Sequence, residues 1–319
     1  MAQDPALTYL RHGQSPLFRL PVSIGAPPPG TRAVLLGVPF DLGTTYQPGA
    51  RLAPWHVRRV SALLQGWHPV HGVDVFAEVP AVDGGNAAFP PFDPGAMREA
   101  VQGEVSRIAA AGAAPFLLGG DHSIVLPALR ALAKAHGPLA VVHVDAHLDT
   151  SGPETWGEAF HHGTPFRHAL AEGLVARDAL FQVGIRGPWG ASTDADPSRK
   201  HGGVIVSPEL VDAEGAGALG RRIREACGGL PTYVSFDVDA LDPAFVPGTG
   251  TPVPGGLTTR EAFALLRGLA GVRLAGMDVV EVCPALDHGE ATSTLAAHLL
   301  YEGLALLAVE GRRRPGRAG

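Results

Sequence analysis

Seven segments of the chain combine apolar, largely β-branched character with the length of a strand. They cover residues 33–38, 114–118, 139–146, 180–185, 203–207, 232–240 and 274–282. Five helical candidates lie between or after them, at residues 96–112, 123–136, 216–227, 259–270 and 290–309. The second candidate repeats its apolar residues at helical spacing and stops at Gly137. Near-continuous apolar strands separated by helices predict an α/β fold with a parallel sheet covered on both faces.

The chain shows no internal repeat and no linker long enough to separate two domains. We therefore expect one domain over residues 1–319. Its core is expected at about 33–309, with an N-terminal arm at 1–32 and a basic C-terminal tail at 311–319. The Gly- and Pro-rich stretch 80–95 is expected to be a surface loop.

The charge balance argues against nucleic acid as a partner. The formal net charge is −6 and the pI is about 6.1, so no basic surface is predicted. The only basic cluster is GRRRPGR at 311–317, among Gly and Pro, where a solvated tail is the simpler interpretation.

Cysteine usage and hydropathy exclude other classes. Cys227 and Cys283 are the only cysteines, so neither a disulfide framework nor a Cys-ligated zinc site is supported. The first twenty residues lack the basic-then-apolar order of a signal peptide, and no run of eighteen uninterrupted apolar residues occurs. We expect a cytoplasmic protein that does not act with a membrane.

Acidic and histidine side chains stand where four of the predicted strands end. They are Asp121 and His122 after 114–118, Asp145, His147 and Asp149 after 139–146, Asp237 and Asp239 after 232–240, and Glu281 after 274–282. In an open parallel sheet the carboxyl ends of the strands meet at one edge, where chemistry collects. Carboxylates gathered there would be desolvated and would repel one another, unless cations compensate them. The pattern therefore predicts a metal site.

Spacing within the sets supports this prediction. Asp145, His147 and Asp149 are two residues apart, as are Asp237 and Asp239, so each set starts on one side of its strand. Each motif alone has an ordinary structural explanation, such as a turn or a helix cap. Their joint occurrence at strand ends favours function. A set rich in carboxylates and without thiolates favours a hard ion such as Mn²⁺.

Three segments make the sequence resemble the ureohydrolases, the family of arginase and agmatinase: LGGDHSIVLPALRA, VVHVDAHLD and SFDVDALDPAFVPGTGTPVPGG. The segments at 37–54, 161–170 and 276–293 also look agmatinase-like, and the resemblance covers about residues 33–309. It implies a three-layer αβα fold with a mostly parallel eight-stranded sheet. It also implies two Mn²⁺ per subunit.

The resemblance implies the ligands of each ion. The first ion would be held by His122, Asp145, Asp149 and Asp237, and the second by Asp145, His147, Asp237 and Asp239, so that Asp145 and Asp237 bridge. One departure is Leu148, where many relatives carry Thr or Ser. Because Leu148 is not a ligand, it bears on hydrogen bonding around the ions rather than on metal binding.

Three residues are candidates for catalysis. Two ions that share a water lower its pKa and supply hydroxide near neutral pH. Asp149 can accept a hydrogen bond from this hydroxide and pass its proton onward. Glu281 matches the family residue that pairs with the substrate guanidinium. His162, which precedes Gly163 as the family histidine does, is the expected proton shuttle.

The substrate is less determined. The family reaction would release urea and a primary amine from a guanidino compound. The interval after DAHLD lacks Asn, which disfavours arginine. Its Glu154 and Glu158 would suit the ammonium of agmatine, so agmatine is the expected substrate and putrescine the expected amine. Trp156, Phe160 and Tyr46 are candidates to line an apolar channel. The segment HHGTPFRH also resembles proclavaminate amidinohydrolase, so a guanidino acid or a guanidino natural-product intermediate stays open.

Three other classes of protein fit the sequence less well. A deacetylase-type amidohydrolase needs a single-metal Asp-His-Asp site, which would leave His122 and Asp239 superfluous. A formiminoglutamase-like reaction is closer, but such relatives tend to depart from GGDHS. An inactive regulatory relative would be expected to lack a ligand, and all six are present. The resemblance suggests a homotrimer or homohexamer.

Overall fold

The computed structural model describes residues 15–313, and its central feature is an eight-stranded sheet in the order β4-β1-β5-β10-β9-β6-β7-β8. All neighbouring strands in it run parallel. Its strands are β1 (Ala33–Gly37), β4 (Ala81–Asn86), β5 (Ala114–Leu118), β6 (Leu139–Val144), β7 (Val175–Val183), β8 (Val204–Val206), β9 (Pro231–Asp237) and β10 (Arg273–Val280). The short strands β2 (Trp67–His68) and β3 (Val73–Asp74) form a separate antiparallel pair. The predicted fold class is confirmed.

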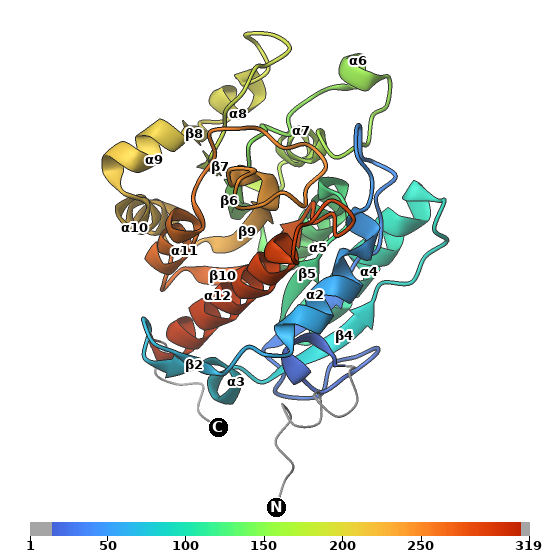
Figure 1. Ribbon diagram of the computed structural model, residues 1–319, viewed down its shortest axis with the longest axis vertical. Helices are drawn as coiled ribbons and strands as arrows, with labels where there is room; N and C mark the ends of the chain where they lie inside the picture. The colour runs from blue at the N-terminus through green and yellow to red at the C-terminus, as the bar shows by residue number, and fades with distance from the viewer. Residues whose placement is uncertain (1–14, 314–319) are drawn as a thin grey trace, which may run out of the picture.

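Helices cover both faces of the sheet, because successive strand residues point to opposite sides. Ala33 and Leu35 of β1 belong to one buried core, and Val34 and Leu36 belong to the other. The first core is closed by α2 (Ala53–Ser61), α10 (Ala216–Cys227), α11 (Thr259–Gly268) and α12 (Ala291–Arg313), and the second by α4 (Pro94–Ala110), α5 (Val125–His136) and α7 (Pro165–Ala171). Figure 1 shows α12 lying along one face, flanked by α2 and α11.

Short helices complete the chain between these elements. They are α3 (Val75–Glu78), α6 (Pro153–Trp156), α8 (Asp196–Lys200) and α9 (Pro208–Glu214), with 3₁₀ turns η1 (Leu17–Arg19), η2 (Ala50–Leu52), η3 (His122–Ile124) and η4 (Val238–Ala240). The turn η4 directly follows β9, and η3 begins four residues after the end of β5, at two of the strand ends where the acidic residues gather. They turn the chain sharply and keep successive side chains close to the sheet edge.

Helix α12 is long and apolar enough to cross a membrane by length and composition alone. Most of its apolar part is buried inside the molecule, where Leu299, Leu300 and Leu304 are fully covered. This burial is that of a core helix, since a helix that is apolar all round is stable inside a large domain as well.

The structure corrects several expectations. Residues 81–86, predicted to lie in a surface loop, form the edge strand β4. Leu17 and Phe18, assigned to an arm outside the core, are buried in it. The basic tail was expected to begin at residue 311, but α12 continues to Arg313, and Arg312 forms an ion pair with Glu78. The rest of the expected tail, 314–319, and residues 1–14 of the arm lie outside the described residues.

Candidate metal centre

The site lies at the carboxyl ends of β5, β10, β9 and β6, which are the four middle strands of the sheet. These are the strands after which the sequence places its acidic and histidine residues. Because all four run parallel, their carboxyl ends share one edge. The fold thus brings together the residues predicted for the site: His122, Asp145, His147, Asp149, Asp237, Asp239 and Glu281.

A first cluster forms around the imidazole of His122. Its Nδ1 lies 3.0 Å from a carboxylate oxygen of Asp145, 2.9 Å from one of Asp149 and 3.4 Å from one of Asp237. All four side chains are almost completely buried. Although three oxygens are this close, His122 Nδ1 has no hydrogen-bond partner among the described residues. A nitrogen lone pair facing three carboxylates is the arrangement that a cation fits.

A second cluster shares Asp145 with the first. His147 Nδ1 lies 3.0 Å from Asp239 and 3.4 Å from the other oxygen of Asp145. The backbone N–H of His147 donates to Asp145 and the N–H of Ala146 donates to Asp239, which fixes both carboxylates. Asp145, His147 and Asp239 offer ligand atoms close enough for a single ion. Two adjoining sites with a shared carboxylate match a binuclear centre.

The pKa shifts of these groups reflect the repulsion among carboxylates that are buried together without a cation. Burial, together with the charges of Asp239 and Asp145, raises the pKa of Asp237 well above its usual value. Burial also raises the pKa of Asp239. Burial alone would lower the pKa of His122, but the three carboxylates around it raise it well above its usual value. Divalent cations would remove this conflict by supplying the missing positive charge.

A row of polar side chains crosses the sheet one layer below these clusters. Strand register aligns Gln182 of β7, His143 of β6, Ser235 of β9 and Asp278 of β10 as direct neighbours. All four are fully buried. None of the four has a role predicted from the sequence, although each is a polar residue inside an apolar run, which was the visible signal.

Two branches of this row hold ligand candidates in place. Ser235 Oγ lies 2.8 Å from His122 Nε2 and donates to Asp278, so its oxygen accepts the Nε2 proton. His122 Nδ1 is then the nitrogen that faces the carboxylates and that would bind a cation. In the other branch, Gln182 donates to His143 Nδ1, so the opposite nitrogen of His143 donates to Asp145 at 2.7 Å. Such contacts fix the tautomer and orientation of ligands.

Glu281 and His162 form a pair beside the clusters. Glu281 Oε1 accepts hydrogen bonds from the backbone N–H of His122 and from His162 Nδ1, both at 2.9 Å. Glu281 Oε2 is buried and has no partner among the described residues. Burial would lower the pKa of His162, but the charge of Glu281 raises it to about 9. Its Nε2 contacts the Thr45 hydroxyl at 2.8 Å. The neighbouring His161 instead accepts a hydrogen bond from a backbone N–H of its own loop.

Backbone strain is confined to a few positions, and two belong to this site. Asp149 and Glu281 have φ values of 51° and 61°, in the left-handed region that non-glycine residues rarely adopt. The surroundings must stabilise such a conformation, and it occurs often at functional sites. The carboxylate of Asp149 lies against His122 Nδ1 in the first cluster, and the carboxylate of Glu281 accepts the backbone N–H of His122 beside it.

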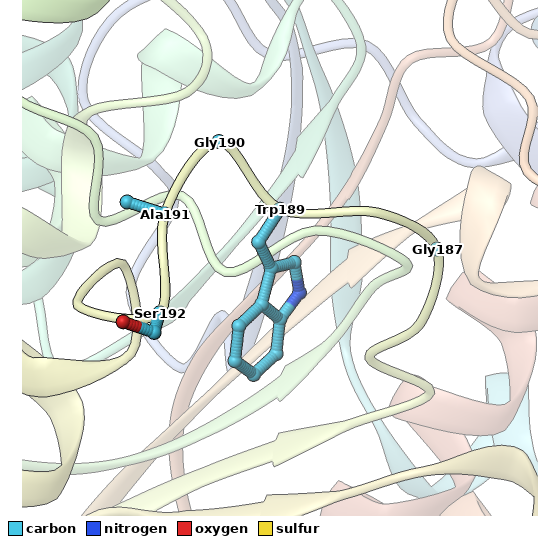
Figure 2. A pocket seen from close by; sticks show the side chains of 5 residues that line it. All are labelled: Gly187, Trp189, Gly190, Ala191 and Ser192. Atoms are coloured by element: carbon cyan, nitrogen blue, oxygen red, sulfur yellow. The ribbon is translucent and has the colours of Figure 1, made fainter.

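A cavity of about 1010 Å³ opens above the clusters. Asp149, Asp237, His147 and His162 reach its floor, and its wall includes Trp156 and Trp189. A shallower pocket of about 590 Å³ adjoins it at the loop of residues 187–192. Figure 2 shows Trp189 as the large side chain of that loop, beside Gly187, Gly190, Ala191 and Ser192.

Residues after DAHLD take positions that the sequence did not determine. Leu148 is buried and packs on Ile185 and Ala195. Trp156 lines the cavity, whereas Tyr46 and Phe160 are not among its lining residues. Phe160 instead stacks on His168 of α7. The proposed apolar channel therefore retains one of its three candidate residues.

Comparison with known proteins agrees with the geometry. The family model for the arginase family matches residues 31–305. The chain belongs to the arginase family. This confirms the resemblance seen in the sequence and the enzyme class, a hydrolase acting on C–N bonds of guanidino compounds. The family is one of binuclear metal-dependent enzymes.

Several relatives are similar over most of their length. The chain is 45% identical over 297 residues to proclavaminate amidinohydrolase of Streptomyces clavuligerus, covering 92% of this chain and 94% of that protein. It is 41% identical to the mitochondrial guanidino acid hydrolase of Homo sapiens (92% and 83%) and 39% identical to the mitochondrial agmatinase of Gallus gallus (92% and 86%).

Solved structures share the fold at comparable similarity. The structure of proclavaminate amidino hydrolase from Streptomyces clavuligerus has a TM-score of 0.87 and 43% identity, over 93% of this chain and 97% of that chain. A Trypanosoma cruzi formiminoglutamase described with Mn²⁺ has a TM-score of 0.80 and 27% identity, over 92% and 99%.

Proposed function

We propose that this protein uses two Mn²⁺ ions to hydrolyse a small guanidino compound to urea and a primary amine. The observation that carries the proposal is the pair of adjoining clusters with Asp145 in common. The manganese-bound formiminoglutamase with the same fold supports the choice of ion. Carboxylate and imidazole ligands without thiolates also suit Mn²⁺.

Six residues would hold the ions. His122, Asp145, Asp149 and Asp237 would bind one of them, in keeping with the contacts of His122 Nδ1. Asp145, His147, Asp237 and Asp239 would bind the other. When bound, such a pair of ions supplies a water of lowered pKa that is a strong nucleophile near neutral pH.

The protein's own side chains would position the substrate and handle its protons. Glu281 Oε2, buried and without a partner, can accept N–H groups of a guanidinium, while Oε1 stays fixed by His122 and His162. Asp149 lies where it can take the proton of the attacking water. His162 lines the cavity and can exchange protons with solvent as the amine leaves. The overall reaction adds one water across a C–N bond: the oxygen of the water becomes the urea oxygen, and its two protons go to the leaving nitrogen, which departs as an ammonium.

Two substrate classes are candidates: agmatine, which would yield putrescine, and guanidino acids. Both are named among the relatives. The argument for agmatine relied on Glu154 and Glu158, and both carboxylates have partners within the protein. Glu154 lies 3.4 Å from Arg167, and Glu158 accepts backbone N–H groups of its own loop. A homotrimer or homohexamer in the cytoplasm is part of the same proposal.

Manganese content and urea release, measured together, test the proposal. Wild type and Asp239→Asn are stripped of metal and reloaded with Mn²⁺, with Asp93→Asn as a control that makes the same charge change at an exposed helix cap. We expect two ions per chain and urea from wild type and control. Asp239→Asn should hold fewer ions and lose urea release by more than about 100-fold, because it removes a proposed ligand rather than a residue around one. One ion in wild type would favour a deacetylase-type enzyme, and none would favour an inactive relative.

A further inference from the structure

Three cationic side chains line the cavity beside the metal clusters, namely Arg167, Arg186 and Lys200, and Arg167 has the fewest commitments within the protein. Arg167 lines the cavity and opens helix α7. The backbone N–H groups of Phe166 and Arg167 both point to the carbonyl oxygen of Asp149, at 3.0 and 3.4 Å. This places the start of the Arg167 side chain directly beside a proposed metal ligand. Its position is therefore fixed relative to the reaction centre.

Arg167 has donor capacity that the protein does not use. Within residues 15–313 its guanidinium has one polar contact, to Glu154 at 3.4 Å, out of five N–H donors. The two side chains are 43% and 68% exposed. An ion pair this long and this solvated contributes little to stability. Arg167 can therefore exchange Glu154 for another anion at little cost.

The other charged groups of the cavity wall are better satisfied. Arg186 donates to the carbonyl oxygens of Gly184, Val253 and residues 239–241 and has no comparable freedom. Asp194 accepts a backbone N–H at 3.1 Å, and Asp196 pairs with Lys200 at 3.1 Å. Among the three cations of the wall, Arg186 is held by several carbonyl oxygens and Lys200 has a shorter ion pair than Arg167, so the contact of Arg167 is the one most easily exchanged.

We propose that Arg167 binds the carboxylate of the substrate, which makes the substrate an ω-guanidino carboxylic acid. This inference rests on the proposed function, since it requires the guanidinium end to lie at Glu281 and the ions. An arginine fork matches a carboxylate through two parallel N–H···O bonds. The ammonium of agmatine would instead face a like charge, which disfavours its binding.

Steady-state kinetics on four manganese-loaded proteins test the role of Arg167. The proteins are wild type, Arg167→Gln, Arg167→Lys and the control Arg130→Gln, which breaks an Arg–Glu pair at the far end of α7. The substrates are 4-guanidinobutyrate, agmatine and the neutral butylguanidine. Urea release gives kcat and KM for each pair.

Wild type should prefer 4-guanidinobutyrate. Arg167→Gln should raise its KM by about 10- to 100-fold, the loss expected for charged hydrogen bonds. The kcat should change little, because the chemistry at the ions is unaffected. Arg167→Lys should restore part of the affinity. The KM of butylguanidine should be the same in Arg167→Gln and in the control. The KM of agmatine should be lower in Arg167→Gln than in wild type.

A separate variant tests whether Glu154 competes with the substrate. Glu154→Gln removes the present partner of Arg167, so KM for 4-guanidinobutyrate should fall or stay constant. A rise in the KM of agmatine alone would assign Glu154 to an ammonium and overturn the proposal.

The role of Arg167 and the proposed function would be contradicted by different results. Urea from 4-guanidinobutyrate with equal KM in Arg167→Gln and the control would overturn the role of Arg167 and leave the proposed function standing. A preference of the wild-type protein for agmatine would also overturn the role of Arg167. No urea from any of the three substrates would instead sink the proposed function itself.

Discussion

Ser235 is the side chain through which the sheet controls the tautomer of His122. Its hydroxyl accepts from His122 Nε2 and donates to Asp278, and it is completely buried. Replacing it with alanine removes a single oxygen and leaves the backbone of β9 unchanged. The His122 Nε2 proton then has no acceptor, and the tautomer with the proton on Nδ1, toward the carboxylates, is no longer excluded.

The size of the effect follows from what loses a partner. A buried donor without an acceptor costs about 1–3 kcal/mol, and Asp278 is spared part of that cost because it keeps bonds from Tyr233 and the backbone of Phe236. We therefore expect metal-free Ser235→Ala to lose about 1–3 kcal/mol of unfolding free energy. Loss of a residue that orients a ligand weakens metal binding by about 10- to 100-fold.

Denaturant unfolding measures the loss of unfolding free energy. Calorimetric titration of the metal-free protein with Mn²⁺ measures the loss of metal affinity. Thr232→Val is the matched control, because Thr232 lies on the same strand, is fully buried and donates its hydroxyl proton to the carbonyl oxygen of Leu230 rather than to a residue of the site. The control should lose some stability and keep its manganese affinity. If folded Ser235→Ala binds manganese as tightly as the control does, the reasoning about the tautomer is refuted.

Two further predictions concern stability. Gly120→Ala should destabilise the fold by about 1–3 kcal/mol in denaturant unfolding, since Gly120 has φ +83° and an added Cβ would lie 2.6 Å from two backbone carbonyls; unchanged stability would contradict this. Burial would raise the pKa of Glu302, but bonds from His68 and Arg267 lower it below 4.5. Its stabilisation is therefore complete above that pH and is lost as pH falls through the lowered pKa. Glu302→Gln should be less stable by about 1–3 kcal/mol at pH 7, and the deficit should shrink in acid; a deficit that grows in acid would show the sign to be wrong.

The sequence predicted seven of the eight strands of the sheet, including the edge strand β8, and missed the other edge strand, β4. Strands β5, β6, β9 and β10 are buried on both faces, so their apolar runs are nearly continuous and easy to recognise. The edge strand β4 reads AVDGGN, and its two glycines and polar residues are typical of a loop. It forms a strand because β1 offers it a partner, which no local pattern reveals.

The residues of the site also fall into those that the sequence predicted and those that it missed. Ligand candidates were visible because each follows a strand end, and the topology brings those ends together. Ser235, Asp278 and His143 were missed because their contacts depend on the register between β6, β9 and β10. Register is a property of the assembled sheet, so a polar residue within one apolar run does not reveal its partner on the next strand. The partners of Glu154 and Glu158 were likewise set by loop geometry.

The products formed in ¹⁸O-labelled water test the central claim most directly. Manganese-loaded protein is incubated with 4-guanidinobutyrate and, separately, with agmatine, and the products are identified by mass spectrometry. We expect urea carrying one ¹⁸O atom together with an equal amount of the unlabelled primary amine. Water adds to the guanidino carbon, and the bond from that carbon to the alkyl-bearing nitrogen breaks. Ammonia with a ureido product, or no reaction of either compound with two ions bound, would contradict it.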